Sequence, residues 1–98
     1  MWIGWIEFDV LLGDVHSLKQ KRAVVRPIIA ELRRSTEASV AEVGAHDLHR
    51  RAELGVAVAG PSADRVTDVL DRAERLVAGH PEVTLLAARR RLRRADDD

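Results

Sequence analysis

The residues best suited to bind a ligand are six basic side chains that lie close together near the N-terminus: Lys19, Lys21, Arg22, Arg26, Arg33 and Arg34. Ammonium and guanidinium groups make charge-assisted hydrogen bonds to phosphate oxygens, which hold nucleic-acid backbones against proteins. No acidic residue interrupts this series before Glu31. The series therefore predicts a phosphate-binding surface, with a plain solvated helix face as the alternative.

A second group with ligand chemistry consists of His46, Asp47 and His49, since imidazole and carboxylate groups bind metal ions. These side chains lie in one polar loop, 44–50, and are too few to close a site. The chain has no cysteine to complete it. We expect neither a metal site nor a cofactor.

Two other pairs of residues have side chains that often act in catalysis, but their positions in the sequence do not suit a catalytic site. Glu7 and Asp9 alternate along an extended segment, where carboxylates usually keep a sheet face wet or form ion pairs with arginines across the strands. His16 and Ser17 are adjacent in sequence, whereas a base and a nucleophile must meet across space. We therefore expect no catalytic residue and a protein that is not an enzyme.

The elements that position these side chains follow from the spacing of apolar residues. Residues 2–12 alternate as a strand does, with Ile6 and Phe8 on one face and Trp5 and Glu7 on the other. A helix is predicted from 18 to 34, because Ser17 can cap its first turn and apolar residues then recur with helical spacing: Leu18, Val25, Ile28, Ile29 and Leu32. The basic residues form a stripe beside this apolar side.

The rest of the chain completes a familiar order of elements. Strands are predicted at 38–43, 51–60 and 82–88, with a second helix from about 63 that stops before Gly79 and Pro81. The order strand, helix, strand, strand, helix, strand predicts a ferredoxin-like α+β sandwich, a four-stranded antiparallel sheet with two helices on one face. We expect one domain over 1–88, followed by a charged C-terminal tail over 89–98.

The sheet face turned away from the helices is predicted to be apolar, with Ile3, Trp5, Leu11 and Ala57 on it. Strand 51–60 carries no aromatic residue, which argues against the base stacking of RNA-recognition motifs. A bare apolar surface of this kind usually marks a protein interface, so we expect a homo-oligomer.

Composition limits the remaining possibilities. The 98 residues suit one domain, and the 16 basic and 16 acidic residues balance, so any affinity for a polyanion must come from local segregation of charge. There is no apolar run long enough for a bilayer and no signal-peptide pattern, so we expect a cytoplasmic protein without a membrane partner.

Several short strings of the sequence resemble the YlxP-like family of small bacterial proteins: Ser17-Leu18-Lys19-Gln20-Lys21-Arg22, Val40-Ala41-Glu42-Val43, Asp47-Leu48, Arg51-Ala52-x-Leu54-Gly55-Val56-Ala57 and Val69-Leu70-Asp71-x-x-Glu74. The resemblance covers nearly the whole chain and implies the ferredoxin-like fold. Members are commonly encoded beside transcription-elongation, translation-initiation and ribosome-maturation factors, which implies a setting without a reaction. Gly44, Ala45 and His49 depart from the Asp, His and Trp of the family pattern, so the resemblance assigns these three residues no role.

Together these observations favour a non-enzymatic accessory protein that binds ribosomal RNA or translation factors through its basic first helix. Acylphosphatases share the predicted fold but need an asparagine, and this chain contains none. The alternative is a homo-oligomeric interaction module that uses the open sheet face and binds no nucleic acid.

Overall fold

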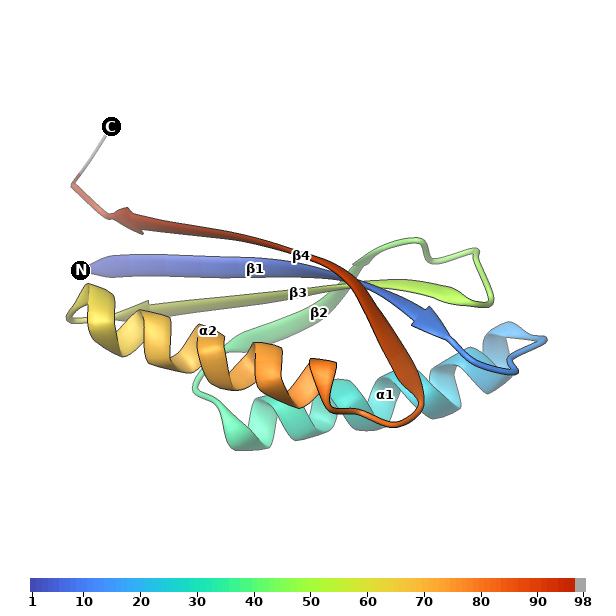
Figure 1. The fold of residues 1–98 in the computed structure, drawn as a ribbon. Coiled ribbons are helices and arrows are strands. Elements are labelled where there is room, and N and C mark those ends of the chain that lie inside the picture. The colour runs from blue at the N-terminus through green and yellow to red at the C-terminus, as the bar shows by residue number, and fades with distance from the viewer. Residues whose placement is uncertain (97–98) are drawn as a thin grey trace.

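The computed structural model describes residues 1–96 and confirms the ferredoxin-like α+β fold (Figure 1). Its elements, in chain order, are β1 (Trp2–Leu12), α1 (Leu18–Ser35), β2 (Ser39–Gly44), β3 (Arg51–Gly60), α2 (Ala63–Ala78) and β4 (Val83–Arg94). Neither described helix has the length and apolar character needed to cross a bilayer.

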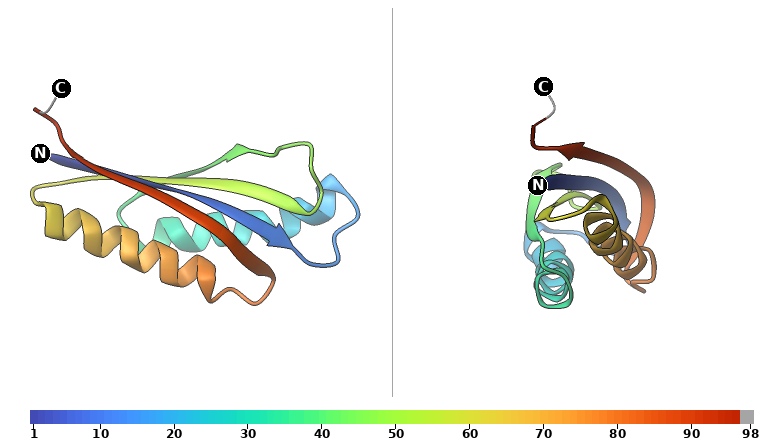
Figure 2. Two further views of the ribbon diagram at one scale, coloured as in Figure 1. Left: turned by 45° about the horizontal axis from the view of Figure 1, so that its top comes forward. Right: turned by 90° about the vertical axis from the view of Figure 1, so that its left-hand side faces the viewer.

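The four strands form one antiparallel sheet in the order β2-β3-β1-β4. The central places of β1 and β3 agree with their strong apolar alternation, and the short, more polar β2 lies at an edge. Both helices pack on the same face of the sheet, and the other face carries no covering element among residues 1–96 (Figures 1 and 2). One face of the sheet is therefore buried beneath the helices, and the other faces solvent.

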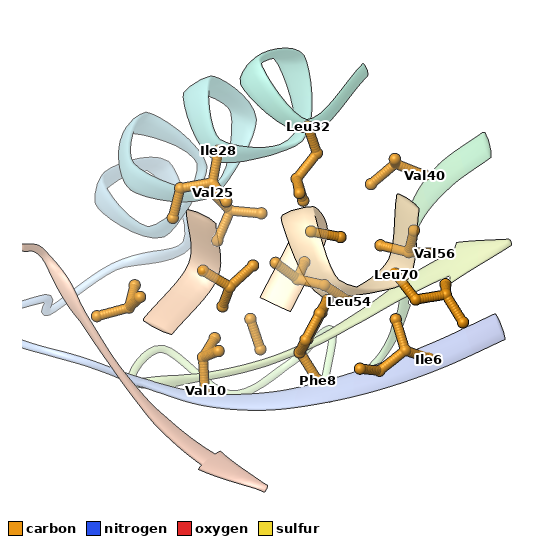
Figure 3. Packing of buried hydrophobic residues seen from close by; sticks show 14 of the residues in the cluster. Ile6, Phe8, Val10, Val25, Ile28, Leu32, Val40, Leu54, Val56 and Leu70 are labelled. Carbon is orange, nitrogen blue, oxygen red and sulfur yellow. The ribbon is translucent and has the colours of Figure 1, made fainter. Parts of the chain in front are cut away.

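The core lies between the sheet and the helices (Figure 3). Ile6, Phe8 and Val10 of β1 have no exposed surface, which follows from the two-residue repeat of a strand. α1 contributes Val25, Ile28 and Leu32, and α2 a longer apolar stripe of Val66, Val69, Leu70, Ala73 and Val77. Each fully buried Leu, Ile or Phe side chain stabilises the fold by about 1.5–3 kcal/mol relative to exposure.

The two helices begin at serine caps. Ser17 Oγ accepts the amide of Gln20 at 3.1 Å, which confirms the predicted cap of α1. The Gln20 side chain accepts the amide of His16, the residue before the cap, at 2.6 Å. Ser62 caps α2 in the same way through the amide of Arg65. These caps satisfy amides that a helix leaves unpaired, so local sequence sets where both helices begin.

The predicted division into a domain over 1–88 and a charged tail over 89–98 is wrong for most of that tail. β4 continues to Arg94 and pairs with β1 along its whole length, so that Arg91 lies opposite Trp5 and Arg94 opposite Trp2. No Gly or Pro interrupts the chain between Ala88 and Arg94, and β1 extends far enough to offer backbone partners. Residues 97–98 of the predicted tail lie outside the described residues.

Candidate nucleic-acid interface

The outer side of α1 carries four of the predicted phosphate-binding residues in exposed positions: Lys19, Arg22, Arg26 and Arg34. Spacings of three, four and eight residues bring side chains to one side of a helix, since the helix turns once in 3.6 residues. Within residues 1–96, none of the four makes an ion pair with a carboxylate. The positive end of the helix dipole adds to the charge near Lys19. This surface, the α1 basic face, is suited to phosphate groups.

Lys21 does not belong to the α1 basic face, which corrects the prediction. Its side chain is only 3% exposed and points inward beside Val25 and Ile28. The ammonium group donates to the carbonyl oxygen of Ala45 at 2.7 Å and lies 2.9 Å from Glu42 Oε2. Because its ammonium group is buried against these partners, Lys21 cannot reach a phosphate in solvent, and it holds α1 against the end of β2 instead.

Arg33 is exposed but already has a partner at the sheet edge. Its guanidinium donates to the carbonyl oxygen of Val40 in β2 at 2.6 Å. Edge strands expose backbone groups that can pair with another chain, and a charged side chain over the edge discourages such pairing. Arg33 therefore serves the edge of β2, whereas the four residues above remain available.

On the open sheet face, the structure brings together the predicted interface residues Ile3, Trp5 and Ala57. Trp5 lies opposite Ala57 and Ile3 opposite Ala59, and Leu11 lies farther along β1, opposite Arg51. Beside Trp5 is a shallow hollow of about 420 Å³ over β2 and β3, lined mainly by apolar and small residues: Trp5, Ile6, Glu7, Ser39, Val40, Ala41, Val43, Gly55, Val56 and Ala57.

Asp9 and Glu7 on this face are paired with arginines, which is one of the two roles that the sequence left open for them. Arg51 donates to both oxygens of Asp9, and Arg89 reaches Glu7 at 3.4 Å. The hydrogen bond from Arg51 lowers the pKa of Asp9 below its ordinary value, and Coulomb attraction adds to this shift against the effect of burial. Asp9 therefore stays ionised and is poorly suited to act as a proton donor near neutral pH.

The arginines of β4 were placed in a tail by the sequence, and the structure divides them between the two sheet faces. Arg90 points toward α2, where it bonds to Asp71 at 2.8 Å and Glu74 at 3.1 Å. Arg91 and Arg93 lie opposite Trp5 and Ile3 and so share the open face with them. The absence of Gly and Pro after Ala88 was the available sequence signal for this continuation of the strand, since five of residues 89–94 are arginines and do not alternate with apolar residues.

The loop over 44–50 positions no metal ligands. His46, Asp47 and His49 are exposed, and among residues 1–96 no three His, Asp or Glu side chains come close enough together to hold a metal ion. Ala45 adopts a left-handed backbone with φ of 57°, and its carbonyl accepts the amide of Leu48 as well as the Lys21 ammonium. The loop is thus fixed at its start by the buried lysine.

Comparison with known proteins agrees with the resemblance seen in the sequence. The chain is 30% identical over 81 residues to the uncharacterized protein YlxP of Bacillus subtilis (strain 168), an alignment that covers 83% of this chain and 88% of that protein. The model of a family described as "Protein of unknown function (DUF503)" matches residues 3–90. With the match extending from β1 into β4, the chain belongs to the DUF503 family.

Proposed function

We propose that this protein is a non-enzymatic accessory protein of the cytoplasm that binds RNA through the α1 basic face. The setting implied by the family resemblance, beside factors of translation and ribosome maturation, favours ribosomal RNA or an RNA-containing translation complex as the ligand. An enzymatic role finds no support in the paired carboxylates of the open face.

One observation carries the proposal, which is that the cations of the α1 basic face lack the acidic partners found elsewhere. Five arginines of other elements pair with carboxylates within residues 1–96: Arg51, Arg65, Arg89, Arg90 and Arg94. Lys19, Arg22, Arg26 and Arg34 have no such partner there. Arg72 and Arg75 of α2 also make no ion pair there, but they lie beside Glu37, Asp68 and Asp71. Because the whole chain has a formal net charge of zero, a local excess such as that of the α1 basic face is needed to attract a polyanion.

The expected binding follows from the kind of interaction. Long basic side chains on a helix reach phosphates and carry no information about base sequence, so affinity should depend little on sequence. Each phosphate that is neutralised releases counterions, so affinity should fall steeply as salt is added. Structured RNA, in which phosphates from adjacent strands lie close together, should bind better than an isolated nucleotide.

The test uses a double charge reversal on the α1 basic face, Arg22→Glu with Arg26→Glu. A matched control, Arg72→Glu with Arg75→Glu, makes the same change in net charge at two exposed positions of α2. We expect the first variant to lose affinity for an RNA hairpin and the control to keep most of it. The dependence of log K on log salt should flatten by about 0.7 to 0.9 for each phosphate that the variant no longer neutralises.

Both variants should retain the circular dichroism spectrum of the wild type, because all four positions are exposed. Equal affinity of the two variants for the hairpin would show that net charge, and not the α1 basic face, controls binding. A wild type without affinity for RNA at low salt would overturn the proposal.

A second candidate function, a homo-oligomeric interaction module, is favoured by the apolar hollow beside Trp5 on the uncovered sheet face. A two-fold dimer would bury this patch from each copy. Trp5→Glu should then lower the mass measured by light scattering without unfolding the chain. A wild type that is monomeric at high concentration would exclude this candidate.

A further inference from the structure

A row of arginines on the edge strand β4 lies beside Trp5 on the open sheet face. The register of β4 against β1 places Arg89 opposite Glu7, Arg91 opposite Trp5 and Arg93 opposite Ile3. Alternate residues on a strand point to the same face and are about 6.7 Å apart, which is close to the spacing of neighbouring phosphates along one nucleic-acid strand. The spacing of these arginines therefore suits the phosphates of an extended RNA strand that lies along β4.

Two members of this row have no acidic partner. Arg89 reaches Glu7, but within residues 1–96 neither Arg91 nor Arg93 makes an ion pair or a side-chain hydrogen bond. Their cross-strand neighbours, Trp5 and Ile3, are apolar. Arg90, on the opposite face of the same strand, is bound by two carboxylates of α2. The open face thus presents uncompensated charge directly beside an aromatic ring.

The hollow on the other side of Trp5 is shallow and mainly apolar. Ala57 of β3 and Ala41 of β2 line it beside Trp5, and the Val43 side chain of β2 lies directly over Gly55. A second hollow of about 330 Å³ is lined by Trp5, Glu7 and the arginines of β4. Trp5, which is partly exposed, separates the two hollows, so a ring stacked on it has apolar surface on one side and guanidinium groups on the other.

We propose that this open face binds single-stranded RNA, with bases stacked on Trp5 beside the apolar hollow, and with phosphates along Arg91 and Arg93. Aromatic stacking platforms flanked by cations are the usual means of holding unpaired bases, whereas the bases of a duplex are stacked on one another and cannot reach the ring. The inference rests on the proposed function and adds a second surface, distinct from the α1 basic face, that selects unpaired segments.

The same face is less suited to a second copy of the chain. In a two-fold dimer centred on Trp5, Arg91 of each copy lies near the axis because it is the direct cross-strand neighbour of Trp5. Uncompensated arginines of the two copies would then approach one another, and like charges brought together in an interface oppose association. The acid beside Trp5, Glu7, already pairs with Arg89, so RNA phosphates are better placed than a second copy to supply the negative charge that Arg91 and Arg93 lack.

The experiment uses the full chain in a Trp2→Phe background, so that Trp5 is the remaining tryptophan and reports on its own surroundings. Trp2 packs against the core on the helix side, and Phe keeps much of that packing. The probes are a single-stranded oligouridine of about ten nucleotides and an RNA duplex of the same length. The variants are Arg91→Glu with Arg93→Glu, Arg22→Glu with Arg26→Glu, and the control Arg72→Glu with Arg75→Glu.

We expect oligouridine to quench Trp5 fluorescence and the duplex to leave it nearly unchanged. Reversal of Arg91 and Arg93 should weaken oligouridine binding at least tenfold and flatten its salt dependence by about 1.4 in log K per log salt, from two phosphates at roughly 0.7 each. The same variant should keep its affinity for the duplex, and the control should resemble the parent with both probes. Trp5→Ala should weaken oligouridine binding roughly 5- to 150-fold, because the bases then have no aromatic ring to stack on.

The outcomes separate this inference from the proposed function. Duplex binding that depends on Arg22 and Arg26, together with oligouridine binding that ignores Arg91 and Arg93, would overturn the inference alone. Oligouridine binding that depends on Arg91 and Arg93 without any duplex binding would support the inference and count against the α1 basic face. A wild type that light scattering shows to be a dimer, with Trp5 unquenched by oligouridine, would overturn the inference in favour of the second copy.

Discussion

The buried ion pair between Lys21 and Glu42 provides a sharp test of how α1 is joined to the sheet. Lys21→Met keeps most of the aliphatic side chain but removes the ammonium group, which lies 2.9 Å from Glu42 Oε2 and 2.7 Å from the carbonyl of Ala45. The glutamate is left without its counter-charge, and the carbonyl loses a charged donor. In the variant, the Glu42 carboxylate and the Ala45 carbonyl would need hydration by water, but the methionine side chain occupies most of the space that the lysine fills in the wild type.

The magnitude follows from the exposure of the two partners. Removing one member of a buried pair costs about 3–5 kcal/mol of folding free energy, and a hydrogen bond from a charged donor contributes about 1.5–3 kcal/mol. The Glu42 side chain is 23% exposed, so its carboxylate can recover part of its hydration by turning outward. We therefore expect Lys21→Met to lower the free energy of unfolding by about 3 kcal/mol, a large part of the 5–15 kcal/mol typical of a domain.

Urea unfolding followed by circular dichroism measures this change, with Lys19→Met as the matched control on the same helix. Lys19 is exposed, so its substitution should change the free energy of unfolding by no more than about 0.5 kcal/mol. The double variant Lys21→Met with Glu42→Leu should be more stable than the sum of the single changes predicts, by at least about 1 kcal/mol. Strict additivity, or a Lys21→Met protein as stable as the control, would refute the ion pair as the link between α1 and β2.

Two further changes test the core and the open face. Gly4→Ala should lower the free energy of unfolding by about 1–3 kcal/mol in urea titrations, because its Cβ would overlap Val66 and come within 2.9 Å of Leu70 Cδ1; a variant of wild-type stability would contradict this packing. Because Arg51 lowers the pKa of Asp9, the folding stability that this carboxylate contributes is present above its unfolded value of 3.8 and is lost as the pH falls through the lower folded value. Asp9→Asn should therefore show a smaller loss of stability than wild type between about pH 6 and pH 2, and equal losses would argue against the pair.

Most of the fold could be predicted because its signals are local. Alternation places the central strands, and the serine caps together with Gly79 define the ends of the helices within about a residue. β4 was the exception, because arginines replace apolar residues in its second half and the pairing that holds it belongs to β1. A strand that depends on a distant partner gives only a weak signal in its own residues.

The candidate site shows the same division. Helical spacing was enough to place Lys19, Arg22, Arg26 and Arg34 on one exposed side. Helical spacing could not show that Lys21 is buried, because its burial depends on two partners from another part of the chain. These partners are the Glu42 carboxylate and the carbonyl oxygen of Ala45. The neighbourhood of Trp5 and Arg91 was likewise hidden, because it depends on the register between strands more than 80 residues apart in sequence.

The most direct measurement of the central claim is the salt dependence of wild-type binding to an RNA duplex, followed by fluorescence anisotropy of the labelled RNA. A duplex cannot stack on Trp5, so its affinity reports on phosphate binding alone. If the four cations of the α1 basic face each neutralise a phosphate, log K should fall against log salt with a slope of about −3, from roughly 0.7 to 0.9 per phosphate. A slope near zero, or no binding at low salt, would contradict RNA binding through α1.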